Sequence, residues 1–180
     1  NTLLMLAQAP IIATLICIVF PNISSAVLFM IAVASIWLGT QNAAREIVSE
    51  NSIYKRERMY NLHIGAYIFS KISVLSIFSI IQCFLFVLII SIRYSTSTSM
   101  INITNPSFFF LWMLFLSVAS IFLGLLLSSL VKTTERAMTI LPLLLMPQIM
   151  LAGLVAKVSN GFVEFISYFT ISRWGVEGFN

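Results

Sequence analysis

The sequence predicts an all-α polytopic membrane protein, a bundle of helices that cross the bilayer several times. Three observations predict this fold class. Of the 180 residues, 59% are hydrophobic and only 9% are charged, whereas a soluble domain carries roughly a quarter charged residues. The mean hydropathy is +1.02. The apolar residues also gather in runs of about twenty, the length that crosses a hydrocarbon layer ~30 Å thick. Such runs must be helical in lipid, because every backbone polar group needs a partner within the segment.

Five apolar runs follow one another along the chain, and together they form one transmembrane domain. The expected spans are residues 3–20, 26–44, 72–92, 108–131 and 137–156. The remaining segment, 157–180, is interrupted by charges and glycines, so we expect an external tail that is helical or re-entrant. An odd number of spans with a half-apolar external tail indicates a sixth span beyond this sequence.

The segment 45–71 is the polar exception to this pattern. It holds five of the ten Lys and Arg residues, three of the six Glu residues and the only His. Wound as a helix, residues 53–60 carry charges on every side and leave no apolar stripe. A helix that lies on lipid needs one broad apolar face opposite a polar one, so we expect this one to dock against protein.

The basic residues also predict the orientation, because cytoplasmic loops are enriched in Lys and Arg. The segment 45–71 holds five and the turn 132–136 holds two, whereas the turn 21–25 holds none and the loop 93–107 holds one. We therefore expect 45–71 and 132–136 in the cytoplasm, with the first span starting inside. We attribute the net charge of +4 to basic residues that set the topology, and we do not expect nucleic-acid binding from it.

Polar and small residues within the spans leave some alternatives open. One stripe at helical spacing near the cytoplasmic end of the second span is either the lining of an aqueous or substrate path or a set of interfacial residues: Gln41, Asn42, Arg45 and Ser49. A ridge of small residues on the fourth span predicts close helix packing: Ser117, Ser120, Gly124 and Ser128. Pro142 and Pro147 predict a bend in the fifth span, which is either a moving gate or a static kink.

Several kinds of chemistry have no residues to support them. The sequence has no Gly-rich phosphate loop of the Walker type and no nucleophile-elbow serine. It has no Asp, and His63 has no partner at metal-ligand spacing. Cys17 and Cys83 lie inside apolar runs, where they are expected as small buried hydrophobic residues. We therefore expect no enzyme activity, cofactor or metal in this segment.

Three motifs, taken in order along the chain, resemble the membrane domain of the G subfamily of ABC transporters, and of its bacterial members in particular. They are NAAREIVSENSIYKRERMYNLHIGAYIFSKI, ERAMTILPLLLMPQIMLAGL and ISRWGVEGF. The first is similar to the segment that leads from the second span into the coupling helix of that family, and carries its characteristic positions: Glu50, Tyr54, Glu57, Tyr67 and Lys71. The third departs from the family by lacking a proline at its start.

The resemblance implies a half-transporter with six spans. A nucleotide-binding domain, which holds ATP and Mg²⁺, would be fused before the spans on the same polypeptide, and two copies would make one transporter. Bacterial members often also carry a forkhead-associated domain. The implied partners are the nucleotide-binding domain, a second copy, membrane lipids and a hydrophobic or lipid-linked substrate, with no nucleic acid. The implied location is the cytoplasmic (inner) membrane of a bacterium.

The resemblance also implies roles for residues. Contact with the nucleotide-binding domain falls on Glu50, Ile53, Tyr54, Arg56, Glu57 and Arg58. The substrate cavity would be lined by Ser35 and Leu38 of the second span and by Met146 and Ile149 of the fifth. Leu154 and Val155 would form the external gate.

The function expected from these observations is outward export of a hydrophobic or lipid-like compound, driven by ATP through alternating access. A secondary transporter is a competing hypothesis, but it needs buried titratable groups or broken helices for ion coupling, and the spans hold no acid at mid-depth. A membrane anchor or scaffold for a cytoplasmic signalling domain is a second alternative, and it fits the same topology.

Overall fold

The computed structural model of the protein describes residues 2–22, 24–51, 54, 56, 63–94, 106–151, 167, 168 and 170–179. Its helices are α1 (Thr2–Val19), α2 (Ser25–Ala43), α3 (Glu46–Ser49), α5 (Ile64–Tyr94), α6 (Pro106–Leu130), α7 (Thr134–Leu151) and α9 (Ile171–Phe179). The described residues contain no strand. The prediction of an all-α helical bundle is therefore confirmed.

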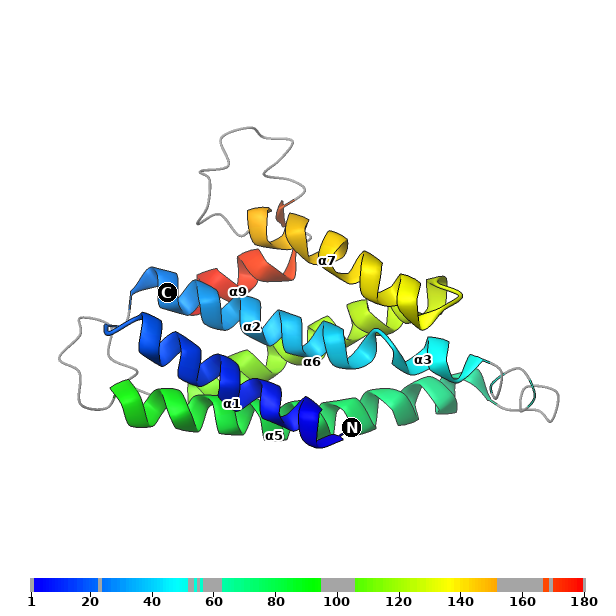
Figure 1. Ribbon diagram of the computed structural model, residues 1–180, viewed down its shortest axis with the longest axis horizontal. Helices are drawn as coiled ribbons and strands as arrows, with labels where there is room; N and C mark the ends of the chain where they lie inside the picture. Colours follow the sequence, from blue (N-terminus) through cyan, green and yellow to red (C-terminus); the bar gives the residue numbers. More distant parts are fainter. Residues whose placement is uncertain are drawn as a thin grey trace.

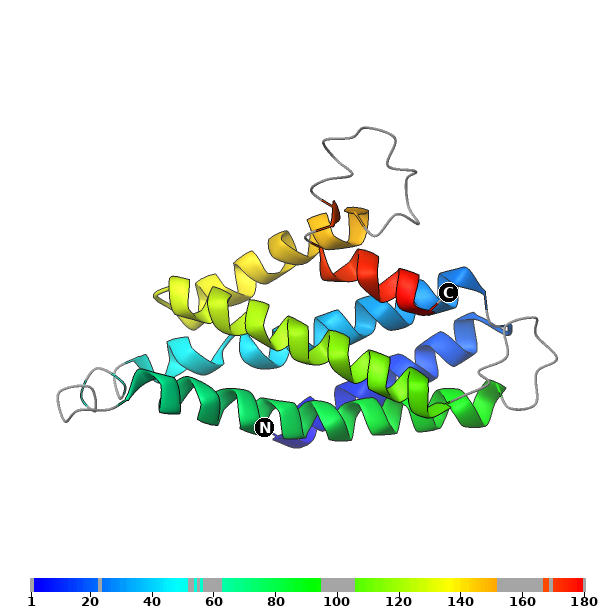
Figure 2. The ribbon, with the colours of Figure 1, turned by 180° about the vertical axis from the view of Figure 1, so that it is seen from behind.

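Helix α2 occupies the middle of the bundle, where it contacts α1, α5, α6, α7 and α9. The four helices α1, α2, α5 and α6 run lengthwise beside one another, and α7 and α9 lie along one side of this group (Figure 1). The view from behind shows α6 lying across the group, with α5 along the opposite edge from α7 (Figure 2). Helix α2 therefore lies between α1, α5 and α6 on one side and α7 on the other.

Among the described residues, three helical segments are long and apolar enough to cross a membrane: Ser25–Ser49, Ile64–Tyr94 and Pro106–Leu130. The apolar part of α1, Leu3–Val19, is shorter than these three segments. The described part of α7 is not among the segments that reach the length and hydropathy of a membrane span. The number of five spans therefore stays a prediction. Helix α5 begins at Ile64 and not at residue 72. Its 31 residues extend ~46 Å at about 1.5 Å per residue, which exceeds a hydrocarbon layer of ~30 Å.

Helices α2 and α6 approach each other at two glycines. A Cβ atom added at Gly39 would overlap the backbone oxygen of Ser117, and one added at Gly124 would lie 2.7 Å from the backbone oxygen of Thr40. Only glycine fits where backbones come this close. The small residues of the predicted ridge are all buried: Ser117, Ser120, Gly124 and Ser128. The packing interpretation of this ridge is confirmed.

A chain of amide hydrogen bonds joins α1, α2 and α5 inside the bundle. The Asn42 side-chain nitrogen donates to Gln82 Oε1 at 2.8 Å, and Gln82 Nε2 donates to the backbone oxygen of Met5 at 2.7 Å. Asn42 is 2% exposed and Gln82 is 1% exposed. Asn42 therefore neither lines an aqueous path nor lies at an interface with water within this chain; it connects helices.

Helix α9 folds back onto α2, α6 and α7. The Trp112 indole nitrogen donates to the backbone oxygen of Gly175 at 3.2 Å, and the Ser172 hydroxyl donates to the backbone oxygen of Gln148. A Cβ atom added at Gly178 would collide with the indole ring of Trp112. The described part of the expected external tail is thus helical and packed against the bundle.

Candidate functional site

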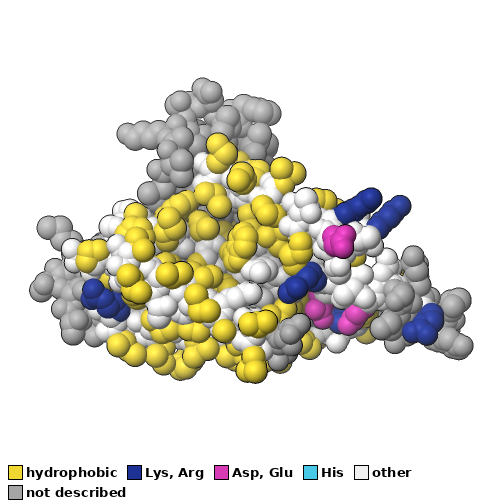
Figure 3. Space-filling view, viewed as in Figure 1, with side chains coloured by type: hydrophobic (Ala, Val, Ile, Leu, Met, Phe, Trp, Pro, Cys, Tyr) yellow, Lys and Arg dark blue, Asp and Glu magenta, His cyan; other side chains and the backbone are white. Residues whose placement is uncertain are grey.

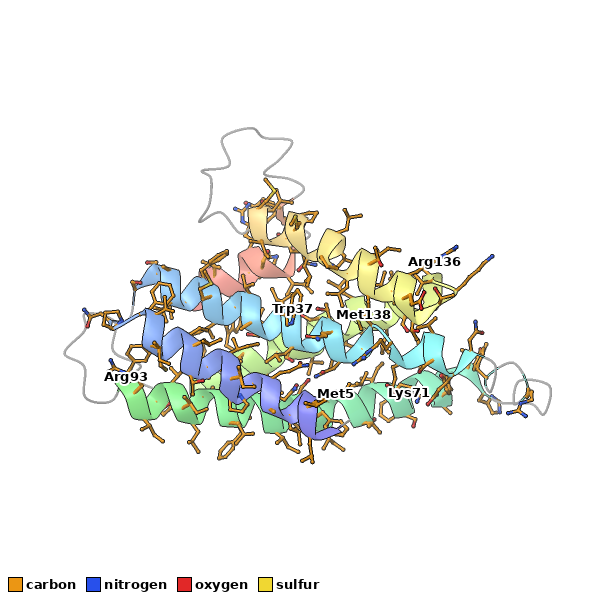
Figure 4. The ribbon with its side chains drawn as sticks, viewed as in Figure 1. Met5, Trp37, Lys71, Arg93, Arg136 and Met138 are labelled. Carbon is orange, nitrogen blue, oxygen red and sulfur yellow. The ribbon has the colours of Figure 1, made fainter. Side chains whose placement is uncertain are left out.

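Charged side chains gather at one end of the molecule. In Figure 3 acidic and basic residues lie together over α3 and the start of α7, while hydrophobic side chains cover the flank between the two ends. Lys71 and Arg136 belong to this end, and Arg93 lies at the opposite end of α5 (Figure 4). We call the end that carries α3 the polar end.

Helix α3 is fixed to α6 at the polar end. The backbone N–H groups of Ile47 and Val48 both donate to Ser128 Oγ, each at 3.0 Å. These groups belong to the first turn of α3, where backbone donors have no partner within the helix. A side chain from another helix thus does what an N-cap residue usually does, and α3 is tied to the last turns of α6.

Helix α3 is also fixed to α5, by an ion-paired group. Lys71 Nζ lies 2.9 Å from Glu46 Oε1 and 2.7 Å from Glu50 Oε1. The hydroxyl of Tyr67 donates to Glu50 Oε2 at 3.2 Å. Glu46 and Glu50 lie one helical turn apart, so without the ammonium group their carboxylates would repel each other. The Lys71 side chain is 16% exposed, and this screening from water strengthens its attraction to both carboxylates.

A cavity of about 290 Å³ lies between α3, α5 and α6 beside this group. Its lining is mainly apolar with a few polar side chains: Ile47, Val48, Asn51, Tyr54, Ile64, Tyr67, Ile68, Ser128, Ser129 and Val131. The rings of Tyr54 and Tyr67 stand 5.0 Å apart between centroids. Tyr54 therefore contacts α5 through an aromatic pair, in addition to the ion pairs that Glu46 and Glu50 make with it.

Of the five characteristic positions of the first motif, four lie together in the structure: Glu50, Tyr54, Tyr67 and Lys71. Of the residues expected to contact a nucleotide-binding domain, Glu50 and Tyr54 have side chains that interact with α5, whereas Arg56 is exposed. The other three, Ile53, Glu57 and Arg58, lie outside the described residues. Lys71 and Tyr67 were recognisable only through the family pattern, because no local periodicity links residue 50 to residue 71.

The residues expected to line a substrate cavity do not meet within the chain. Ser35 and Leu38 on α2 are 0% and 1% exposed, and Leu38 packs in the cluster formed with α1 and α5. Met146 on α7 is 64% exposed. Successive helical residues are turned by about 100°, so Ser35 and Leu38 point away from the side of α2 that faces α7.

The space between α2, α7 and α9, which we call the α2–α7 crevice, has a different lining on α2. A small cavity of about 10 Å³ lies there, bounded by Val33, Ile36, Trp37, Leu145, Gln148, Ile149 and Ser172. Figure 4 shows Trp37 between α2 and α7. Ile149 lines this crevice, and the α2 residues beside it are Val33, Ile36 and Trp37. The assignment of Ser35, Leu38, Met146 and Ile149 to a substrate cavity stays a prediction. The expected gate residues Leu154 and Val155 lie outside the described residues.

One side of α7 is strongly exposed and apolar. Leu143, Met146 and Met150 are 72%, 64% and 65% exposed and lie on one face at helical spacing. We call this the α7 apolar face. Among the described residues no group of three His, Cys, Asp or Glu side chains comes together, and Cys17 and Cys83 are buried as expected.

Comparison with known proteins gives two matches. The model of a family described as ABC-2 type transporter matches residues 1–180. The chain is 27% identical over 158 residues to an ABC transporter ATP-binding/permease protein of Mycobacterium tuberculosis, a match that covers 86% of this chain and 18% of that protein. The chain thus spans less than a fifth of this relative. No solved structure matches the chain.

Proposed function

Because the chain belongs to the ABC-2 type transporter family, we propose that it is the membrane domain of an ATP-driven exporter, which moves a hydrophobic or lipid-like compound outward by alternating access. A membrane domain of this family is not itself catalytic, and ATP is hydrolysed in a nucleotide-binding domain. The mycobacterial relative is named as both an ATP-binding protein and a permease. This supports a nucleotide-binding domain, with its ATP and Mg²⁺, on the same polypeptide.

The observation that carries the proposal is the double attachment of α3 at the polar end. Ser128 holds α3 to α6, and Lys71 holds it to α5. A push on the segment after α3 therefore reaches two long helices at once, without depending on a single flexible side chain. In this mechanism Ile53, Arg56, Glu57 and Arg58 receive the push from the nucleotide-binding domain, and Glu50 and Tyr54 transmit it to α5.

A second copy of the chain completes the transporter in this proposal. The α7 apolar face and the exposed edge of Trp37 form an apolar surface beside the crevice, and an exposed patch of this kind is typical of an interaction site. Two such surfaces facing each other would enclose a path for an apolar solute, with Met146 and Ile149 at its wall and Leu154 and Val155 at its external end.

The polar end faces the cytoplasm in this proposal, and the first span starts inside. The excess of Lys and Arg in 45–71 and 132–136 supports this orientation. The location is the cytoplasmic membrane of a bacterium.

The test uses the full-length protein reconstituted in lipid vesicles, with ATP hydrolysis and outward movement of a fluorescent phospholipid analogue measured in the same preparation. Lys71→Met removes the cation between Glu46 and Glu50 and breaks the ion pairs that join α3 to α5, so we expect ATP hydrolysis to persist while lipid movement falls by about tenfold. Tyr54→Ala and Glu57→Ala are expected to reduce lipid movement in the same way.

The matched control is Arg93→Met, which removes a cation from the opposite end of α5 and is expected to leave lipid movement unchanged. Wild-type lipid movement in all three polar-end variants contradicts the coupling assignment. Absence of ATP-dependent movement in the wild type, with normal ATP hydrolysis, contradicts export and favours the scaffold hypothesis.

A further inference from the structure

We propose that the cavity of about 290 Å³ between α3, α5 and α6 binds a small neutral molecule that has a flat apolar body and a hydrogen-bond acceptor, such as a carbonyl oxygen. A molecule held there contacts all three helices and keeps α3 docked against the other two. The binding site stands on the cavity alone, whereas the effect of the ligand on transport rests on the proposed export function.

The first observation is the size and the neutrality of the cavity. Its volume of about 290 Å³ is close to the lower end of the range for small-molecule sites, ~300–1,000 Å³. One ordered water needs only about 10–15 Å³. The described residues that line the cavity include no charged side chain, and the neighbouring Glu50 and Lys71 pair with each other. The cavity therefore suits a neutral molecule larger than water and offers an ion no counter-charge.

The second observation is a buried hydroxyl donor in the cavity wall. Ser128 lines the cavity and is 1% exposed. Its Oγ atom accepts from the backbone N–H groups of Ile47 and Val48, each at 3.0 Å. A hydroxyl group has two acceptor lone pairs and one proton to donate, so these bonds occupy both lone pairs, and no described residue accepts the proton. Because nearly all buried polar groups are hydrogen-bonded, an acceptor atom of a ligand fits this position.

The third observation is how other polar side chains of the lining are used. The hydroxyl of Ser129 donates to the backbone oxygen of Leu126 at 2.7 Å, and that of Tyr67 donates to Glu50 at 3.2 Å. The side-chain amide of Asn51, by contrast, makes no hydrogen bond with a described residue. Its N–H groups offer a second donor on the same cavity, which again favours a ligand that accepts.

The fourth observation is an aromatic wall. The rings of Tyr54 and Tyr67 lie 5.0 Å apart between centroids, with their planes inclined at 42°. Aromatic rings pack well against further rings in offset or tilted arrangements. Ile64 and Ile68 of α5 add apolar surface to the same lining. The lining therefore favours a flat aromatic body over a sugar or a peptide.

The position of the cavity gives the ligand a mechanical effect. The cavity is bounded by the three helices that Ser128 and Lys71 join. Undocking of α3 opens the cavity and releases the ligand, so the ligand stabilises the docked arrangement by mass action. In the export mechanism, a larger docked fraction passes more of the push from the nucleotide-binding domain into α5 and α6.

The chain offers two matched pairs of variants. Ile68 and Ile81 both lie on α5 and are 40% and 41% exposed, but only Ile68 lines the cavity. Ile68→Trp therefore fills the cavity, and Ile81→Trp adds the same ring elsewhere on the helix. Ser128→Ala removes the hydroxyl proton that no described residue accepts, whereas Ser129→Ala removes a neighbouring hydroxyl whose proton is already used.

The test measures equilibrium binding to the full-length protein in lipid nanodiscs without nucleotide, with empty discs as the blank. The probes are radiolabelled 2-acetylnaphthalene and 2-isopropenylnaphthalene, which have nearly the same shape and differ in a carbonyl oxygen that replaces a methylene carbon. We expect wild type to bind the ketone about fivefold more tightly, the ratio that about 1 kcal/mol from one net hydrogen bond gives.

The variants separate the place of binding from its chemistry. Ile68→Trp should weaken binding of both probes by about tenfold or more, because the added ring overfills the cavity, and Ile81→Trp should leave binding unchanged. Ser128→Ala should bring the ratio of ketone to alkene affinity toward one, and Ser129→Ala should keep it.

Hydrogen exchange tests whether the ligand holds α3 in place. At a ketone concentration of about ten times its Kd, exchange at the Ile47 and Val48 amides should slow by about tenfold, because undocking must first release the ligand. Exchange in α1, which lies away from the cavity, should stay the same.

Equal binding of ketone and alkene by wild type overturns the inference, because the cavity then takes any apolar body, a lipid acyl chain included. Equal weakening by Ile68→Trp and Ile81→Trp overturns it as well, and so does failure of the ketone to bind above the blank. ATP-dependent lipid movement, measured on the same preparation, separates the two proposals. Movement without ketone binding leaves the export function standing, whereas ketone binding without movement leaves the site standing and contradicts export.

Discussion

Helix α2 has two contrasting sides. Toward α6 it is closed, since Gly39 and Gly124 bring the two backbones so close that no Cβ atom fits between them. Larger side chains, among them Trp37, separate α2 from α7, and they leave a small cavity that Gln148 also lines.

The difference indicates which parts of the bundle move together. Close backbone packing and the amide chain through Gln82 hold α1, α2, α5 and α6 as one unit, because a small shift there would break several contacts at once. The crevice side has fewer such constraints. Pro142 and Pro147, both inside α7, also remove backbone hydrogen bonds from that helix. A change of conformation is therefore expected between α2 and α7.

The largest expected effect comes from breaking the closed side. Gly39→Val adds a side chain whose Cβ atom would overlap the Ser117 backbone oxygen. Because a backbone oxygen cannot rotate away, the helices must separate, and we expect a loss of about 3 kcal/mol or more of stability. The measurement is the thermal unfolding midpoint and the yield of monodisperse protein in detergent.

Gly65→Ala is the control for this change, since a Cβ atom at Gly65 meets nothing within 4 Å. It should leave stability unchanged or raise it by up to about 1 kcal/mol, because Ala is the better helix former. If Gly39→Val and Gly65→Ala unfold at the same temperature, α2 and α6 are not held as closely as described.

A smaller effect is expected from the amide chain on the same side. Gln82→Met leaves the Asn42 amide nitrogen without its acceptor, and an unpaired buried polar group costs about 1–3 kcal/mol. Hydrogen exchange should rise first in α1, because the bond to the Met5 backbone oxygen is lost as well. Unchanged exchange in α1 would mean that packing alone holds this helix.

The junction at the polar end should respond more weakly. Ser128→Ala removes the acceptor for the Ile47 and Val48 N–H groups, a change comparable to loss of an N-cap, which costs about 1 kcal/mol. We expect faster exchange at these two amides with little change in the unfolding midpoint. A global loss of stability instead would show that α3 is part of the core.

The smallest effect on protomer stability is expected on the open side. Met146→Ala shortens a side chain that is 64% exposed, so stability should change by less than about 0.5 kcal/mol. If two copies meet at the α7 apolar face, the fraction of dimer measured by light scattering should nevertheless fall. Destabilisation as large as that of Gly39→Val would remove the contrast between the two sides.

Composition and run length were sufficient to predict the helical bundle and the small-residue ridge of α6, because both depend on residue size and polarity along one helix. They were not sufficient to place the start of α5. Residues 64–71 were grouped with the charged segment 45–71 because Lys71 ends them. In the structure they belong to α5, and Lys71 pairs with Glu46 and Glu50 from another element.

The site illustrates the same limit. Glu50 and Lys71 were found through a family pattern, but Gln82 gave no signal, since a single amide in an apolar run looks the same whether it faces lipid or Asn42. The side of α2 that faces α7 also could not be read from the sequence. Apolar residues surround the whole helix, so nothing in their periodicity separates Leu38 from Trp37.

The contact at Gly39 has a consequence for how this sequence can vary. Its nearest neighbour is a backbone oxygen, which is present whatever residue occupies position 117. No second substitution on α6 can therefore make room for a side chain at position 39. At Gly124 a change of Ala43 to glycine would remove one obstacle, the Ala43 Cβ atom, but the backbone oxygen of Thr40 would remain. Related sequences that keep this helix pair should thus retain glycine at 39 and 124, while the side chains at 40 and 117 are freer to change.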